Sequence, residues 1–122
     1  MTSQGSPYAR FRRALDRGNL ADALSSAAEL EHVGLADALE LCLLLREAQP
    51  ERFQKAALRW HGRYCREVGD VALDEGLAVL SLLAALRGPR GSLAASALAE
   101  LLSRRRGLEP ISEVLVAWAR KA

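Results

Sequence analysis

Few residues in this sequence of 122 have side chains that could bind a metal or attack a substrate. His61 and Cys65 are four residues apart, and on a helix this spacing places an imidazole and a thiol one turn apart. Such a pair could supply two ligands of one metal, or a nucleophile and its base. His32 and Cys42 could complete a metal site only if the fold brought them close. Because two ligands do not make a site and no orienting acid is identifiable, we expect neither a metal site nor a Cys–His catalytic pair.

Carboxylates that could work as a general acid and base occur at Asp37, Glu40, Asp74 and Glu75. The same positions fall on solvent-facing strips and in first helical turns, where acids stabilise a helix. The glycine-rich segment at 87–91 lacks the lysine and the preceding strand of a phosphate-binding loop. We therefore expect no catalytic residue, no cofactor-binding residue and no cofactor, and a protein that is not an enzyme.

The most concentrated charge lies in the segment ERFQKAALRWHGRYCREVG, residues 51–69. On a helix its basic residues fall inside an arc of about 80°, and its aromatic residues occupy a separate arc of similar width. Burying the aromatic arc would present all the cations together on the outside. The cations form a row that we call the basic stripe: Arg52, Lys55, Arg59, Arg63 and Arg66.

Two interpretations of the basic stripe follow. It could be a solvated face that partly pairs with residues 19–48, which contain six acids and one arginine. It could instead be the surface that binds a polyanion or an acidic protein partner, because arginine forks suit phosphates and carboxylates. The sequence has no helix-turn-helix pattern, zinc-finger spacing or base-stacking set of aromatics. A nucleic-acid partner is thus the alternative to a protein partner.

Length and composition set the class of protein. Half of the residues are apolar and the net charge is +2, so we expect one all-helical domain over residues 1–122, with residues 1–6 flexible. Two cysteines 23 residues apart suit a reducing cytoplasm. The longest apolar run, residues 76–86, is too short to span a membrane. We expect a cytoplasmic protein with no membrane partner.

Helix start and stop signals predict an all-α fold of six or seven short helices. Ser6 and Asn19 are expected to cap the first two helices, and Asp70 and Ser92 the fifth and sixth. Short connections favour antiparallel neighbours in an irregular bundle or a short stack of helical hairpins. The predicted helices run from 7 to 16, 19 to about 33, 35 to 48, 50 to 68, 70 to 86, 92 to 106 and 110 to 118.

Apolar residues indicate which surfaces are buried. The helices at 35–48 and 70–86 are apolar nearly all round, which is typical of helices buried on several sides. Leu43, Trp60 and Leu83 are expected in the core. The apolar side of the last helix is a candidate interface, and a symmetric homodimer is a further partner hypothesis. This candidate apolar interface consists of Ile111, Leu115 and Trp118.

Three segments carry a family resemblance: LADALELCLLL, AALRWHGRY from Ala56 to Tyr64, and LDEGLAVLSLLAAL from Leu73 to Leu86. Their hydrophobic pattern and the Arg-Trp-His run at 59–61 resemble small all-helical proteins of unassigned function in high-GC Gram-positive bacteria. The resemblance covers residues 8–106 and implies a bacterial cytosol. It brings no catalytic residues. The resulting hypothesis is a non-enzymatic helical interaction or regulatory module, with a nucleic-acid-binding accessory protein as the alternative.

Overall fold

A computed structural model describes residues 6–121 of the chain, and all regular secondary structure within that range is α-helical. The predicted all-α fold is therefore confirmed. The flexibility predicted for residues 1–6 concerns residues outside the described range, except for Ser6. The described helices are α1 (Pro7–Arg17), α2 (Leu20–Ala27), α3 (Leu35–Ala48), α4 (Pro50–Val68), α5 (Leu73–Ala85), α6 (Gly91–Leu102) and α7 (Glu109–Lys121).

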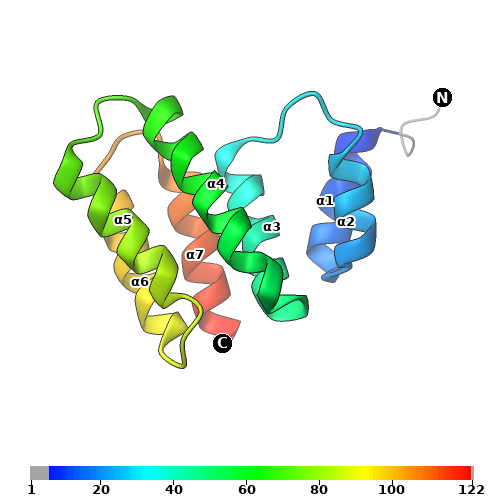
Figure 1. The fold of residues 1–122 in the computed structure, drawn as a ribbon. Coiled ribbons are helices and arrows are strands. Elements are labelled where there is room, and N and C mark those ends of the chain that lie inside the picture. Colours follow the sequence, from blue (N-terminus) through cyan, green and yellow to red (C-terminus); the bar gives the residue numbers. More distant parts are fainter. Residues whose placement is uncertain (1–5, 122) are drawn as a thin grey trace.

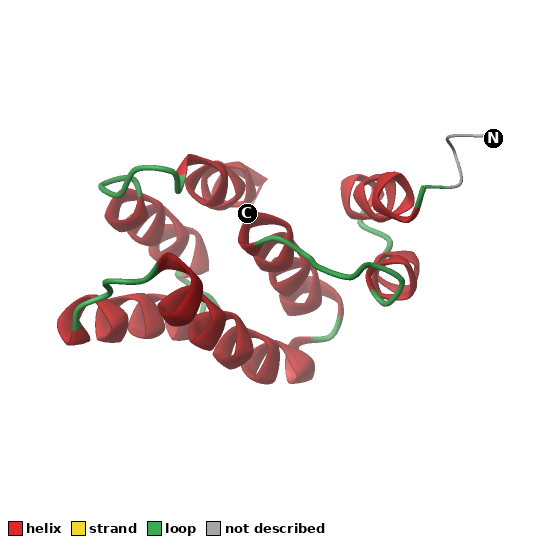
Figure 2. Ribbon diagram, turned by 90° about the horizontal axis from the view of Figure 1, so that it is seen from above, coloured by secondary structure: helices red, strands yellow, loops and turns green. Residues whose placement is uncertain are grey.

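Helices α3 to α7 form a closed bundle in which each helix packs against the next and α7 returns to pack against α3 (Figure 1). The remaining two helices form a hairpin beside this bundle. Among the described helices, α1 and α2 contact only each other and α3, and the view from above shows the hairpin standing to one side (Figure 2). The predicted irregular helical bundle is thus confirmed, with a hairpin appended to its first helix.

Two separate hydrophobic cores hold these parts together. The main core lies inside the α3–α7 bundle and contains Leu43, Trp60 and Leu83, as expected from the sequence. The smaller core joins the hairpin to α3 and is built around Phe11 and Leu15. Helix α3 contributes to both cores from different sides, which explains why its sequence is apolar nearly all round.

The first two helices begin as predicted. The Ser6 hydroxyl accepts a hydrogen bond of 3.3 Å from the backbone N–H of Ala9, and the Asn19 side chain accepts one of 3.0 Å from Asp22. Helix α2, however, ends at Ala27 and not near Val33. Residues 28–34 instead cross to α3 as an irregular segment, which leaves the Val33 carbonyl free to accept a hydrogen bond from α4.

Two predicted caps were wrong. Asp70 does not cap α5, because it has a positive φ of 54° directly after Gly69, and the helix starts three residues later at Leu73. Ser92 does not cap α6, which starts at Gly91. A Cβ at position 91 would lie 2.6 Å from the Leu86 carbonyl oxygen, so this close approach of two backbones requires glycine. Helix α6 also ends at Leu102, before Arg106.

Candidate functional site

The basic stripe lies on α4, the longest helix of the bundle, and the predicted separation of its two arcs is confirmed. Phe53, Trp60 and Tyr64 are buried in the main core, where the Trp60 and Tyr64 rings stack 5.5 Å apart. The Trp60 indole N–H donates a hydrogen bond of 2.8 Å to the Leu35 carbonyl, which fixes α4 against the start of α3. Burial of the aromatic arc leaves four members of the stripe exposed.

Arg63 is the member of the stripe with a structural role. Its side chain is half-buried and donates a hydrogen bond of 2.7 Å to the Val33 carbonyl, so it holds the α2–α3 connection against α4. It also forms an ion pair of 2.7 Å with Glu67, one turn further along α4. This pair lowers the pKa of the Glu67 carboxyl through the hydrogen bond from Arg63. Among the described residues, the side chains of Lys55, Arg59 and Arg66 form neither a hydrogen bond nor an ion pair.

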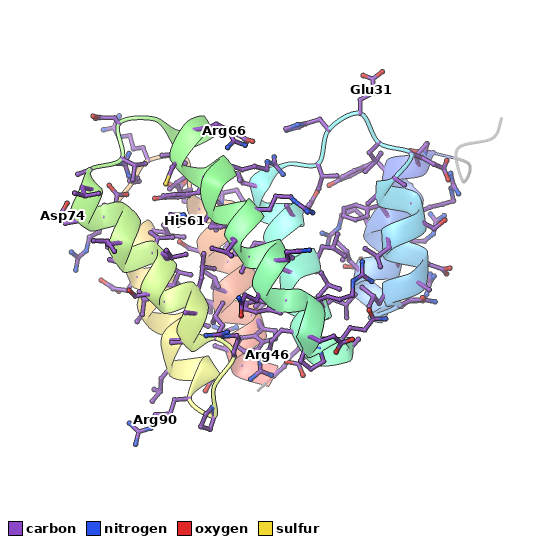
Figure 3. The ribbon with its side chains drawn as sticks, in the orientation of Figure 1. Glu31, Arg46, His61, Arg66, Asp74 and Arg90 are labelled. Atoms are coloured by element: carbon purple, nitrogen blue, oxygen red, sulfur yellow. The ribbon has the colours of Figure 1, made fainter. Side chains whose placement is uncertain are left out.

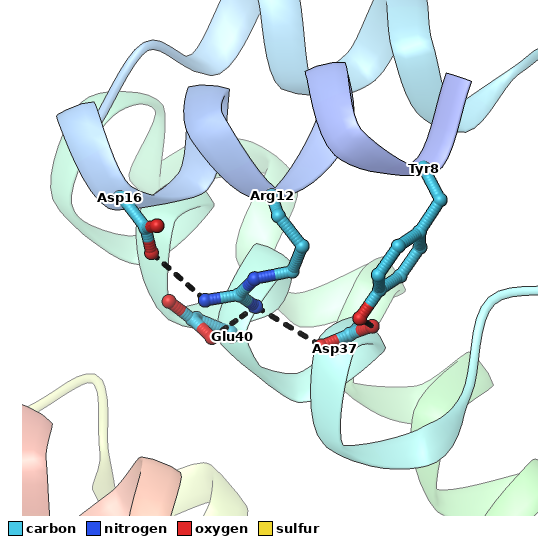
Figure 4. A network of polar contacts seen from close by, with 5 residues as sticks. All are labelled: Tyr8, Arg12, Asp16, Asp37 and Glu40. Atoms are coloured by element: carbon cyan, nitrogen blue, oxygen red, sulfur yellow. Dashed lines mark hydrogen bonds and ion pairs between the residues drawn. The ribbon is translucent and has the colours of Figure 1, made fainter. Parts of the chain in front are cut away.

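Five of the six acids of residues 19–48 do not neutralise the basic stripe, because they pair with arginines outside the stripe. Arg12 of α1 contacts Asp37 at 3.0 Å and Glu40 at 2.9 Å on α3, and Asp16 on its own helix at 2.8 Å (Figure 4). The Tyr8 hydroxyl donates to Asp37 at 3.0 Å, and burial followed by this hydrogen bond raises the Tyr8 pKa. These contacts attach the α1–α2 hairpin to α3. Similar pairs join Arg10 to Glu29, Arg17 to Asp22 and Arg46 to Glu47.

A groove lies beside the basic stripe, between α2, α3 and α4, and encloses a volume of about 890 Å³. Its α4 side carries four cations and one acid, Glu51. Its opposite side, formed by α2, the α2–α3 connection and α3, carries no charged residue. Arg66 does not line it. We call this site the basic groove; its apolar wall is Leu24, Val33, Ala38, Leu41 and Leu45, and its basic wall is Arg52, Lys55, Arg59 and Arg63.

A second groove, of about 730 Å³, lies on another side of α3 and is bounded by α1 and α7. Five acids and three cations line it, so its charge balance is opposite to that of the basic groove. Most of its charge is already used within the protein, since Arg12 binds Asp16, Asp37 and Glu40. The charge of this second groove is therefore largely neutralised within the protein, whereas the Lys55 and Arg59 side chains of the basic groove are unpaired in the described chain.

The prediction that the last helix carries an exposed apolar interface was wrong. Ile111 is 3% exposed and Leu115 is fully buried, because α7 packs against both α6 and α3 and places them in the main core. Trp118 is half-buried, with the Arg46 guanidinium 5.1 Å from its ring centre. The homodimer hypothesis also depended on the apolar fifth helix, where Leu73 and Leu77 are exposed, and it stays a prediction. The exposed leucines lie elsewhere, at 58, 73, 77 and 93.

His61 and Cys65 are close, but their geometry does not activate the thiol. The His61 Nε2 atom lies 2.8 Å from the Gly76 carbonyl oxygen and 3.8 Å from Cys65 Sγ (Figure 3 labels His61). A carbonyl only accepts, so Nε2 carries the proton and cannot take another from the nearby thiol. Cys42 is buried, which raises its pKa to about 12 and keeps it a neutral thiol. No group of three or more metal-ligating side chains occurs among residues 6–121.

The four carboxylates considered from the sequence belong to structural networks. Asp37 and Glu40 share Arg12, as described above. Glu75 accepts hydrogen bonds of 2.6 and 2.7 Å from Arg105 and one of 2.9 Å from the Tyr64 hydroxyl. The Arg105 hydrogen bond lowers the Glu75 pKa, and burial raises the Tyr64 pKa to about 12. Asp74 is exposed and accepts a hydrogen bond of 2.9 Å from the Glu75 backbone N–H.

Sequence reasoning found the basic wall of the groove but missed its apolar wall. Leu41 and Leu45 belong to a helix that is apolar on nearly every side, so the pattern alone does not show which side stays open. No helix in the described part of the chain has the length and apolarity that crossing a membrane needs.

Comparison with protein-family models, curated proteins and solved structures finds no match to this chain.

Proposed function

We propose that this chain is a non-enzymatic protein-interaction module of a bacterial cytosol, and that the basic groove is its binding site. The observation that carries the proposal is the pairing of an uncharged apolar wall with a row of cations, two of which, Lys55 and Arg59, have no partner in the described chain. Apolar surface supplies affinity for a protein partner, and the cations fix its orientation and exclude partners of the wrong charge.

The composition of the groove favours a protein over a nucleic acid. A nucleic-acid strand offers phosphates that are matched by cations, and its bases are read by stacking aromatics or groove-entering side chains. The wall opposite the cations consists of leucine, valine and alanine side chains, and Trp60 is 2% exposed and so gives no stacking platform. Arg63 is also engaged with Val33 and Glu67. The nucleic-acid alternative would instead use the whole stripe, including Arg66 outside the groove.

The non-enzymatic part of the proposal is supported by the structural roles of the candidate groups within residues 6–121. The His61 proton points to Gly76, Cys42 is a neutral thiol, and Glu75 is saturated by Arg105 and Tyr64. The residues with unusual electrostatics thus have structural explanations, and none of them lines the groove as a free acid, base or nucleophile.

Two matched charge reversals test the proposal. Arg59 lines the groove and Arg66 does not, although both are exposed arginines of the same stripe. Tagged parent, Arg59→Glu and Arg66→Glu proteins would be incubated with bacterial cytosol, with and without nuclease treatment, and captured proteins would be identified by mass spectrometry. We expect one set of proteins that the parent and Arg66→Glu retain and Arg59→Glu loses.

Circular dichroism and thermal unfolding of both variants should match the parent, because neither arginine makes a hydrogen bond or ion pair in the described chain. Retention that depends on nucleic acid, and falls equally in Arg59→Glu and Arg66→Glu, would overturn the proposal in favour of the nucleic-acid alternative. Identical capture by all three proteins would remove the groove as the binding site.

A further inference from the structure

We propose that the basic groove receives an amphipathic α-helix of a partner protein, with an apolar face on the α2–α3 wall and acidic residues along the flank that faces α4. This inference rests on the proposed function and specifies the chemistry of the partner. It is carried by the regular spacing of the two walls and by their opposite character.

The spacing of the cations fits a helix lying along α4. Arg52, Lys55, Arg59 and Arg63 follow one another at intervals of three or four residues, so each lies about one turn, roughly 5 Å, beyond the last. The whole row spans about 16 Å, or three turns. A helix beside α4 presents its own side chains at the same interval, and acids on one of its flanks can face each cation in turn.

The apolar wall has the same periodicity. Ala38, Leu41 and Leu45 recur at three and four residues along α3, and such rows form the ridges against which a neighbouring helix packs. Ala38 and Leu41 are half-buried and offer most of this surface, since Leu45 is 5% exposed. Leu24 of α2 closes the far side. A bound helix meets this wall with one stripe and the cations with the next stripe round its circumference. An extended segment alternates its side chains between opposite faces and matches neither interval.

The distribution of charge separates this occupant from an anionic lipid. A lipid carries its charge at one head group and would need cations clustered at one end of an apolar channel. In the basic groove the cations follow the entire α4 wall, and two of them at its centre, Lys55 and Arg59, are unpaired in the described chain. Several acids spread over three turns of a ligand fit this distribution.

The test uses synthetic helical peptides and the purified protein. The first peptide, of about 16 residues, has a leucine stripe flanked by four glutamates at intervals of three, four and four residues. The second has the same composition, with the glutamates dispersed round the helix. Binding is measured by fluorescence anisotropy. We expect the first peptide to bind at least about tenfold more tightly than the second, and its binding to weaken with salt.

Three protein variants locate the bound peptide. Arg59→Glu and Leu41→Glu should each reduce affinity at least about tenfold, because one reverses the basic wall and the other places a charge in the apolar wall. Arg66→Glu should bind as the parent does. A third peptide with lysines replacing the glutamates should bind Lys55→Glu/Arg59→Glu more tightly than it binds Arg66→Glu/Arg90→Glu, which has the same net charge but keeps the cations of the groove.

Several results would overturn the inference. Equal affinity for the first two peptides would show that helical placement of the acids does not matter. Tighter, Arg59-dependent binding to duplex DNA or to vesicles of anionic phospholipid would assign the groove to another class of ligand. If no peptide binds while cytosolic proteins are still captured in an Arg59-dependent manner, the helical partner is wrong and the proposed function stands.

Discussion

The guanidinium carbon of Arg46 lies 5.1 Å from the centre of the Trp118 ring, so a cation near the end of α3 stacks on an aromatic of α7. The same guanidinium donates hydrogen bonds to the carbonyls of Leu86, at 2.8 Å, and Gly88, at 3.3 Å. These carbonyls follow α5, where the helix has ended and its last acceptors need partners. One side chain therefore connects three parts of the bundle that are distant in sequence.

Replacing Arg46 by methionine should lower the free energy of unfolding by about 1–3 kcal/mol, because the apolar stem stays while the charged hydrogen bonds and the ring contact are lost. Urea unfolding followed by circular dichroism measures the change. Arg90→Met is the matched control, since the Arg90 side chain is exposed and forms no hydrogen bond or ion pair in the described chain (Figure 3). Equal losses in the two variants would contradict the role of Arg46.

Truncating a core leucine should cost far more than truncating an exposed one. Leu43 is 2% exposed in the main core, and Leu43→Ala should reduce stability by about 2–5 kcal/mol through lost burial and the cavity left behind. Leu77 on α5 is 58% exposed, and Leu77→Ala should change stability by about 0.5 kcal/mol or less. Thermal unfolding that ranks the two variants equally would be inconsistent with the placement of α3.

Tyr64 should make the protein sensitive to alkali. Burial raises its pKa to about 12 in the folded protein, against about 10 in an unfolded chain. The neutral phenol therefore stabilises the fold fully below about pH 10, and this contribution disappears as the pH rises to about 12. Over that range the parent should lose stability more steeply than Tyr64→Phe, which has no phenol to ionise. Parallel unfolding curves for the two proteins would refute the prediction.

Glu75 should make the protein sensitive to acid. The hydrogen bond from Arg105 lowers its pKa, so the ionised carboxylate contributes stability above its unfolded pKa of about 4.5, and that contribution is lost as the pH falls. Glu75→Gln should be less stable than the parent at neutral pH, with a difference that shrinks below about pH 4.5. Glu113→Gln, an exposed control on α7, should show no such dependence in the same pH series of urea titrations.

Local sequence signals predicted the elements of this fold, and long-range contacts decided the details. Proline, glycine and small polar caps marked most helix boundaries, because these residues act through their own backbone or the next turn. The start of α6 at Gly91 depends on a close contact across the α5–α6 connection, because a side chain at position 91 would collide with the Leu86 carbonyl. The burial of Ile111 and Leu115 depends on the packing of α7 against α3. Helical periodicity shows that one face of a helix is apolar, but it does not show which element covers that face.

The candidate site was predictable to the same extent. The spacing of basic and aromatic residues on one helix identified the arc that carries Arg52, Lys55, Arg59, Arg63 and Arg66. The groove itself arises between helices, because α2, which carries Leu24, ends early and residues 28–34 place Val33 beside the same groove. Likewise, Asp37 and Glu40 of α3 form ion pairs with Arg12 because α1 packs against α3. The number of charges in the sequence does not predict which residues pair.

The smaller core of the α1–α2 hairpin has a consequence for hydrogen exchange. Phe11, Ala14, Leu15 and Ala23 form the core of a hairpin that, among the described helices, packs only against α3. Its backbone amides should therefore exchange with deuterium through a partial opening that leaves the five-helix bundle intact. Leu24 and Val33, at the edge of this unit, also line the basic groove. A ligand bound in the groove would contact both the hairpin and α4, and would therefore stabilise the packed position of the hairpin. Its binding should slow deuterium exchange of the backbone amides of α1 and α2, although the arginines that attract it lie on α4.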